Sequence, residues 1–134
     1  MENLACLQSV VENLVSSHSP FHVVANLEKD LLLRGYLALK EGNEWNLEEG
    51  KGYFVKRNDS SIIAFRLPKE SAGLCFHIAA SHSDSPSFKI KPNPLTLSGG
   101  FALLQTEPYG GGIYHTWMDR PLSFAGRILY SDQS

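Results

Sequence analysis

Residues 74–91 read LCFHIAASHSDSPSFKIK, and the expected fold is built around them. Leu74 to Ala80 is a short, almost continuous apolar run, which is typical of a strand buried on both faces of a sheet. Residues 81–85, SHSDS, are then polar, and Pro86 opposes further strand pairing. Ligands of open α/β sheets bind beyond the carboxyl ends of the strands, so a functional site is expected at this polar cluster.

The side chains of interest in the cluster are His82 and Asp84. Residues two apart on an extended segment point the same way, so the Asp84 carboxylate can accept the N–H of one His82 ring nitrogen. That bond would fix the tautomer and leave the other nitrogen able to bind a metal ion. The pattern alone leaves two interpretations open: a metal site, or a polar loop in which Asp84 forms an Asx turn before Pro86.

Length and composition describe an ordinary globular domain. The chain has 134 residues, of which 43% are hydrophobic and 19% charged, so we expect one domain at most. The net charge of -2 gives no basic surface for nucleic acid or an anionic membrane, and we expect neither as a partner.

The predicted location is cytoplasmic. The sequence shows neither a secretory signal pattern nor an apolar stretch long enough to span a bilayer. Cys6 and Cys75 each lie within an apolar pattern, so we expect buried free thiols rather than a disulfide or a nucleophile.

The first 35 residues predict two helices. Residues 2–17 have the spacing of an amphipathic helix with one buried stripe, and residues 20–34 follow as a second helix. Ser19 and Pro20 suit its N-terminus, and Gly35 suits its end. The stripe of the first helix is Leu4, Leu7, Val10, Val11, Leu14 and Val15, and the inward residues of the second are Val23, Val24, Leu27, Leu31 and Leu32. His18 and His22 are interpreted as surface or capping residues.

The rest of the chain predicts strands and turns. A short strand is expected near residues 36–40, and Asn58 and Asp59 should form the turn of a hairpin, because both tolerate positive φ. The hairpin strands are residues 53–56 and 61–67, and later strands are expected at 88–91, 101–106 and 124–130. The glycines at 110–112 predict a turn, and no Lys-Ser/Thr follows them as in a phosphate-binding loop.

Four segments carry a resemblance to a known family. They are SPFHVVANLEKDLLLRGY (19–36), YFVKRNDSSIIAFRLP (53–68), HIAASHSDSPSFKIKPNP (77–94) and EPYGGGIYHTWMDRPLSFAGRI (107–128). The chain resembles the amino-terminal part of the M18 aspartyl aminopeptidases, which are zinc metallopeptidases. The resemblance covers nearly the whole chain, and SHSDSP and YGGGIYHTWMDRPLSFAGR are its most specific motifs.

The resemblance implies a site and a reaction. It assigns His82 as a zinc ligand and Asp84 as the catalytic-site carboxylate that holds its ring. Family members carry two zinc ions and use a glutamate to activate water against the N-terminal peptide bond of peptides, with a preference for acidic N-terminal residues. Their other ligands and the glutamate lie beyond the part that this chain resembles, so we expect the isolated chain to be an inactive, truncated or split piece. Lys89 and Lys91 are better interpreted as solvated lysines than as specificity residues.

The resemblance also implies an architecture. We expect an α/β fold with two N-terminal helices on a mixed β-sheet, as the incomplete N-terminal part of a zinc-peptidase catalytic domain. Residues 1–118 would belong to that domain, and residues 119–134 would begin an inserted dimerisation domain. The expected partners are a peptide substrate and either a second copy in a homo-oligomer or a sister chain that completes the site. A non-catalytic interaction module or a truncated relic is the alternative.

Overall fold

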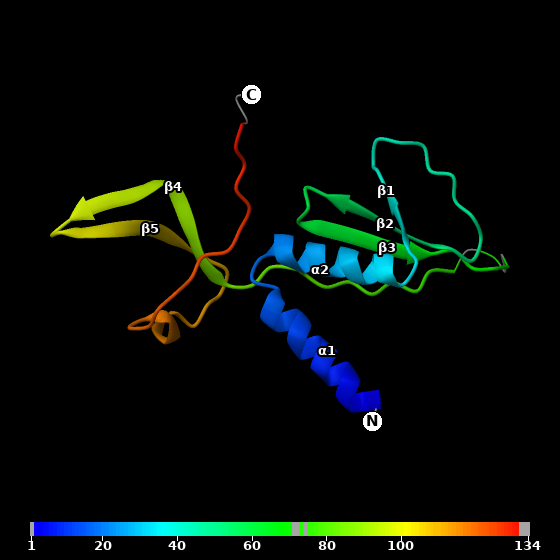
Figure 1. The fold of residues 1–134 in the computed structure, drawn as a ribbon, viewed down its shortest axis with the longest axis horizontal. Coiled ribbons are helices and arrows are strands. Elements are labelled where there is room, and N and C mark those ends of the chain that lie inside the picture. Colours follow the sequence, from blue (N-terminus) through cyan, green and yellow to red (C-terminus); the bar gives the residue numbers. More distant parts are fainter. Residues whose placement is uncertain (1, 71–72, 74, 132–134) are drawn as a thin grey trace. The chain divides into compact units, whose positions relative to one another are not determined.

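The computed structural model describes residues 2–70, 73 and 75–131, with the side chains of residues 2 and 3 left aside (Figure 1). The chain forms two compact units, one from residues 1–83 and 125–134 and the other from residues 84–124. Each unit is described by itself.

The first unit contains two helices and a mixed three-stranded sheet. Its elements are α1 (Glu2–Ser16), α2 (Pro20–Leu33), β1 (Leu37–Leu39), β2 (Gly52–Arg57) and β3 (Ser61–Arg66). The strand order is β1-β2-β3, with β1 parallel and β3 antiparallel to the central β2. Helix α2 contacts all three strands, and α1 meets α2 where the two helices join and extends away from it (Figure 1). The predicted fold class, two helices with a mixed sheet, is confirmed.

Both ends of α2 follow from local sequence. Ser19 is the N-cap residue and Pro20 the first helical residue, where its fixed φ and missing N–H are tolerated. At the other end Gly35 has a φ of 78°, which suits a residue without a Cβ. The Gly35 N–H donates to the Leu32 carbonyl at 3.0 Å, and the Tyr36 N–H donates to the Leu31 carbonyl at 2.9 Å. This Schellman pair ends the helix where the sequence predicts.

The core of the first unit lies between α2 and β2. The buried hydrophobic residues are Val24, Tyr53, Phe54 and Val55. The buried Tyr53 ring stacks on Phe65 at 5.7 Å, and its hydroxyl accepts the Glu48 N–H at 2.7 Å. Gly52 is also buried, and a Cβ there would lie 2.6 Å from the Tyr36 ring, so only glycine fits without movement. The hairpin turn is confirmed, with Asn58 and Asp59 at φ 52° and 54°.

The prediction of a buried stripe on the first helix is wrong. Its six apolar side chains are between 50% (Val10) and 72% (Leu4) exposed, and Cys6 is an exposed free thiol rather than a buried one. On α2 only Val24 is fully buried, and Leu27 and Leu32 are exposed. The reason is that α1 contacts α2 alone among the described elements, so most of its apolar face meets no second surface.

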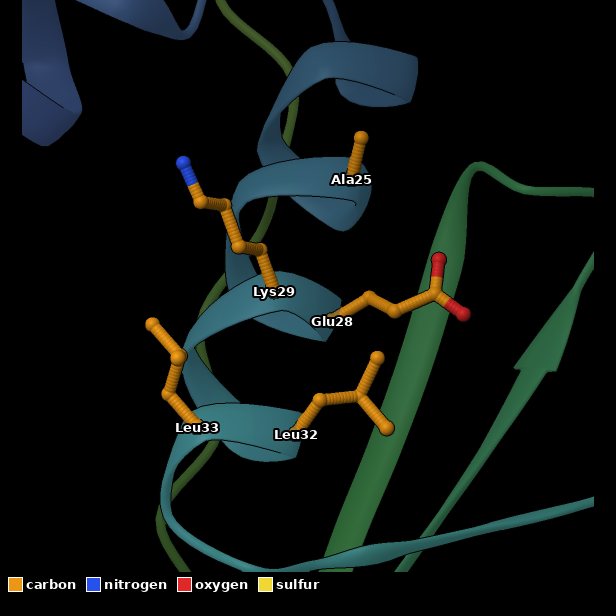
Figure 2. Close-up of a pocket in the computed structure, with 5 residues that line it drawn as sticks. All are labelled: Ala25, Glu28, Lys29, Leu32 and Leu33. Atoms are coloured by element: carbon orange, nitrogen blue, oxygen red, sulfur yellow. The ribbon is translucent and has the colours of Figure 1, made fainter.

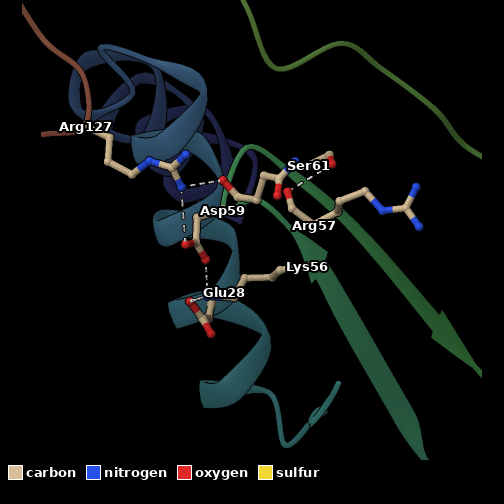
Figure 3. Close-up of polar contacts among 7 residues, drawn as sticks. Glu28, Lys56, Arg57, Asp59, Ser61 and Arg127 are labelled. Atoms are coloured by element: carbon tan, nitrogen blue, oxygen red, sulfur yellow. Dashed lines mark hydrogen bonds and ion pairs between the residues drawn. The ribbon is translucent and has the colours of Figure 1, made fainter. Parts of the chain in front are cut away.

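A polar network joins α2, the β2–β3 turn and residue 127 (Figure 3). The Lys56 ammonium lies 2.6 Å from Glu28 and 3.1 Å from Asp59. Arg127 Nη1 donates to the Asn58 carbonyl at 2.8 Å and lies 3.7 Å from the Asp59 carboxylate. Its guanidinium also lies 4.5 Å from the Phe21 ring centroid. The network therefore holds the chain near residue 127 against this turn.

The Glu28 and Lys56 pair is expected to stabilise the first unit measurably. In a double-mutant cycle with Glu28→Gln and Lys56→Met, we expect a coupling of about 0.5–1 kcal/mol in urea unfolding, as for a well-formed ion pair near the surface. The exposed Lys51 and Glu48 pair, at 2.9 Å, is the matched control and should couple more weakly. Equal coupling energies in the two pairs, or no coupling between Glu28 and Lys56, would contradict the expectation that the Glu28 and Lys56 pair stabilises the first unit.

The same pair predicts a pH dependence. The hydrogen bond to Glu28 is the main cause that raises the Lys56 pKa above its usual value. Lys56 thus binds its proton more tightly in the folded state, and the stabilisation is fully present below the unfolded lysine pKa of about 10.4. This stabilisation should be lost as the pH rises through the higher pKa that Lys56 has in the folded state.

The second unit is a long hairpin followed by a short helical turn. Its elements are β4 (Ser87–Ser98), β5 (Phe101–Tyr109) and η1 (Tyr114–Trp117). Gly99 and Gly100, at φ 58° and 80°, form the two-residue turn between the antiparallel strands. Strand β4 is longer than predicted because pairing resumes at Leu95 after a register shift that begins at Ile90. Pro92 and Pro94, within this gap, have no N–H for the ladder.

The predictions of a buried strand at residues 74–80 and of a strand at residues 124–130 are wrong. Residues 75–86 and 121–131 carry no helix or strand, and Leu74 lies outside the described residues. Ile78 and Ile128 are each 86% exposed, and Cys75 is an exposed free thiol, not a buried one. A strand buried on both faces needs hydrogen-bonded neighbours and covering layers, and the described part of the chain supplies neither here.

Within residues 2–70, 73 and 75–131, no helix is long and apolar enough to cross a membrane. The predicted boundary between residues 118 and 119 stays a prediction, and residues 132–134 of its second segment lie outside the described ranges.

Candidate functional site

His82 and Asp84 lie in the irregular segment directly before β4. The His82 side chain is exposed, and Asp84 is half-buried. The boundary between the two units falls between Ser83 and Asp84. Ser83 Oγ donates to the Ser60 carbonyl at 3.1 Å, which ties the last residue of the first unit's segment to the β2–β3 turn.

Asp84 has a short hydrogen bond within the second unit. The Tyr109 hydroxyl donates to Asp84 Oδ2 at 2.6 Å, a length typical of an O–H bonded to a charged carboxylate. This hydrogen bond, reinforced by the negative charge of Asp84, raises the Tyr109 pKa above its ordinary value. Tyr109 therefore stays protonated, and able to donate, over the neutral pH range.

The glycine turn after Tyr109 packs closely on Pro86. A Cβ at Gly110 would lie 3.4 Å from the Pro86 Cα, and one at Gly112 would lie 3.6 Å from the Pro86 Cβ. Gly110 also has a φ of 75°, where an L side chain is strained. The predicted turn at these glycines is thus found, and its close approach to residues 84–86 is what the sequence did not reveal.

Other polar and charged side chains outside this segment have structural explanations. Ser19 Oγ lies 2.8 Å from His22 Nδ1, so His22 contacts the side chain of the N-cap residue, although among the described residues no side-chain hydrogen bond caps the backbone of α2. Lys89 is exposed and lies 3.9 Å from its cross-strand partner Glu107, as expected of a solvated lysine. Asp119 has a φ of 53°, and Arg120 donates to the Thr116 carbonyl at 3.2 Å, so both lie where the chain turns.

A zinc ion would find suitable donors here but too few of them. The imidazole of His82 and the carboxylate of Asp84 are the groups that a zinc ligand and its orienting partner require. A catalytic zinc site takes three protein ligands and a water. Among the residues that the structure describes, no three His, Cys, Asp or Glu side chains gather in a way that could hold a metal ion.

An open hollow on α2 holds none of the predicted site residues. Figure 2 shows the side chains that line it, which all come from this helix: Ala25, Glu28, Lys29, Leu32 and Leu33. Its acidic member, Glu28, is already paired with Lys56. We assign no chemistry to this hollow.

Comparisons with known proteins point to a zinc enzyme family, in agreement with the imidazole and carboxylate donors of His82 and Asp84. A family model described as aminopeptidase I zinc metalloprotease (M18) matches residues 13–134, which places the chain among the zinc metallopeptidases. The match includes His82, Asp84 and Tyr109 and covers most of the chain. The chain belongs to the M18 family of aminopeptidases.

Curated relatives and solved structures extend this finding. The chain is 44% identical over 129 residues to "Probable M18 family aminopeptidase 2" of Clostridium acetobutylicum, covering 95% of this chain and 30% of that protein. It is 39% identical over 132 residues to "Aspartyl aminopeptidase 1" of Schizosaccharomyces pombe, covering 96% and 28%. The chain therefore spans less than a third of the length of these relatives.

Among solved structures, the chain resembles one in a cryo-EM structure of the Ape4 and Nbr1 complex, with a TM-score of 0.82 and 40% identity. That match covers 86% of this chain and 22% of the other. Aminopeptidase I of Borrelia burgdorferi matches with a TM-score of 0.67 at 20% identity, over 90% of this chain and 30% of the other, and supports the fold alone.

Proposed function

We propose that the chain acts as the N-terminal segment of a dinuclear zinc aminopeptidase, in which His82 binds zinc and Asp84 orients the His82 ring. The observation that carries this proposal is the zinc metalloprotease match, which runs through the His82 and Asp84 segment. The arrangement of these two side chains is inferred from their spacing on an extended segment and from the family resemblance.

The proposed roles follow from the chemistry of each side chain. Zinc, when bound, lowers the pKa of a coordinated water and polarises the scissile carbonyl. The neutral His82 ring supplies a nitrogen lone pair, and the Asp84 carboxylate accepts the N–H of the other ring nitrogen, which fixes the tautomer. The remaining ligands and the base would come from polypeptide outside these 134 residues, so the chain by itself should be inactive. The proposed substrates are peptides with an acidic N-terminal residue, as the name of the S. pombe relative suggests.

The proposed setting is an assembly in the cytoplasm. The other part of the site would be supplied within a longer chain or by a sister chain, and the complete enzyme would be a homo-oligomer. We propose neither nucleic acid nor membrane as a partner, in keeping with the net charge of -2.

A chimera tests the function. This chain would replace the matching 129-residue segment of the C. acetobutylicum relative, to which it is 44% identical. We expect the chimera to hydrolyse aminoacyl p-nitroanilides in a zinc-dependent way, with aspartyl and glutamyl substrates preferred over leucyl ones. A folded, zinc-loaded chimera without this activity would contradict the proposal, provided that the unaltered relative is active in the same assay.

Asp84→Asn in the chimera should lower kcat/KM and zinc affinity by roughly 10–100-fold, the usual cost of losing a group that orients a metal-bound histidine. An amide can present its N–H to the ring where the carboxylate accepted one, so the tautomer is no longer fixed. Kinetics and competition with a chromophoric chelator measure the two effects. Asp30→Asn is the matched control, because Asp30 is an exposed residue of α2 paired only loosely with Arg34, at 3.6 Å. Equal effects from both substitutions would refute the role of Asp84.

A non-catalytic interaction module is the second candidate, and the exposed apolar stripe of α1 favours it. It predicts that the isolated chain binds an M18 enzyme while the chimera stays inactive. Co-purification of the isolated chain with the intact relative, combined with the chimera assay, separates the two candidates.

A further inference from the structure

Tyr109 occupies a fixed position at the end of the β4–β5 ladder. Tyr109 on β5 pairs with Ser87, the first residue of β4, in the antiparallel register. Asp84 lies three residues before Ser87, in the segment that leads into β4. The Tyr109 ring thus reaches back along residues 84–86, and its hydroxyl meets Asp84 Oδ2 at 2.6 Å. The phenol is attached to a paired strand, while Asp84 lies in a segment without helix or strand, so the rigid partner is Tyr109.

The glycine turn supports the same contact. A Cβ at Gly110 would be in van der Waals contact with the Pro86 Cα at 3.4 Å, and the φ of 75° at Gly110 would strain any residue with a side chain. A Cβ at Gly112 would lie 3.1 Å from the Tyr114 ring and 3.6 Å from the Pro86 Cβ. The Tyr114 hydroxyl donates to the Gly110 carbonyl at 3.0 Å, a hydrogen bond that does not involve Asp84. Phe88 packs against the Tyr114 and Trp117 rings, at centroid distances of 5.6 and 5.3 Å. Residues 84–86 are therefore held by a turn that is itself packed.

We propose that Tyr109 is a positioning residue, which holds the Asp84 carboxylate in one orientation through its hydroxyl, and that the turn at Gly110 keeps the two in reach. The value of this orientation for peptide hydrolysis rests on the proposed function, because Asp84 is the group that would hold the His82 ring. The positioning itself does not depend on zinc and can be measured in the 134-residue chain.

The first experiment measures the Asp84 side-chain rotamer in the 134-residue chain by NMR, from the two couplings between its α and β protons. Two unequal couplings are expected in the unaltered chain, and the difference should be lost in Tyr109→Phe, because the carboxylate then loses its 2.6 Å hydrogen bond to the Tyr109 hydroxyl. Tyr114→Phe is the matched control, since it removes a phenolic hydrogen bond from the same turn without touching Asp84, and it should keep the difference. Unchanged Asp84 couplings in Tyr109→Phe would overturn the proposal.

Tyr109→Phe is uninformative if it unfolds the hairpin, and loss of the NMR contacts between β4 and β5 would show this. A second pair of variants then tests the proposal. Gly110→Ala places a Cβ against Pro86 at a positive φ and should equalise the Asp84 couplings. Gly111→Ala, where a Cβ would meet nothing within 4 Å, should not. Equal couplings in both variants, or in neither, would overturn the proposal.

The chimera separates the positioning role from the catalytic one. There Tyr109→Phe should lower kcat and zinc affinity by roughly 10-fold with KM unchanged, at the lower end of the range for partners of metal-bound histidines. If the Asp84 couplings change while kcat and zinc affinity do not, the positioning role stands and the proposed use of Asp84 fails. If Tyr109→Phe also acts on zinc affinity in an Asp84→Ala background, it works independently of Asp84, which overturns the inference.

Discussion

Replacing His82 with alanine in the chimera should lower kcat/KM by roughly 10³-fold, because a metal ion stabilises the transition state by several kcal/mol and each 1.4 kcal/mol is about tenfold in rate. Alanine offers no lone pair, so one of the zinc ions loses a protein ligand. Zinc content measured by mass spectrometry after dialysis should fall by one ion per chain, while the thermal unfolding of the chimera changes little, since the His82 side chain is exposed.

His18→Ala is the control for this experiment. His18 is also exposed, but it lies between α1 and α2 with its ring 5.9 Å from that of His22. Its replacement should leave activity and zinc content unchanged. If His82→Ala keeps both full zinc content and full activity, His82 is not a ligand and the candidate site is assigned to the wrong residue.

Phe54→Ala should have the largest effect on folding, about 3–5 kcal/mol, because it deletes a buried aromatic ring and leaves a cavity. Phe54 is 1% exposed and lies on the central strand β2, between β1 and β3. Since domains are stable by only about 5–15 kcal/mol, this change should remove a large part of the stability of the first unit. Trp45 stacks on Phe65 at 6.3 Å, so its fluorescence in urea reports this unit.

The experiment uses a Trp117→Phe background, because Trp117 lies in the second unit and would add its own signal. Ile63→Ala is the matched control: Ile63 is on the neighbouring β3, opposite Val55, and is 66% exposed. It should cost only about 0.5 kcal/mol. Similar losses for the two variants would mean that the core is not centred on β2.

The parts of the fold that were predicted correctly depend on neighbours in sequence. Ser19 with Pro20 sets the start of α2, Gly35 sets its end, and Asn58 with Asp59 sets the β2–β3 turn. Each of these signals acts through backbone conformation within a few residues. They are therefore readable without knowing what packs against the segment.

The parts that were wrong depend on distant surfaces. The apolar run at residues 75–80 and the one at 124–130 have strand-like composition, but no described strand pairs with either of them. The stripe of α1 likewise has helical periodicity without a surface to cover it. Apolar pattern shows what a segment is able to bury, and only packing determines whether it does.

The candidate site also has a part that could be predicted from the sequence and a part that could not. His82 and Asp84 were predicted from their spacing and from the resemblance, and their roles remain proposals. Tyr109 was not singled out, because it lies 25 residues after Asp84 and meets it only when β4 and β5 pair. The available signal was the run of glycines directly after it, which indicated a close backbone approach without naming the partner.

The most direct test of the central claim measures zinc content and aminopeptidase activity of the 134-residue chain beside the chimera, both dialysed against the same zinc buffer. We expect that the isolated chain retains no stoichiometric zinc and releases no aspartate from aspartyl p-nitroanilide, while the chimera retains zinc and hydrolyses this substrate. Stoichiometric zinc and zinc-dependent hydrolysis by the isolated chain would contradict it, because His82 would then belong to a site that these residues complete by themselves.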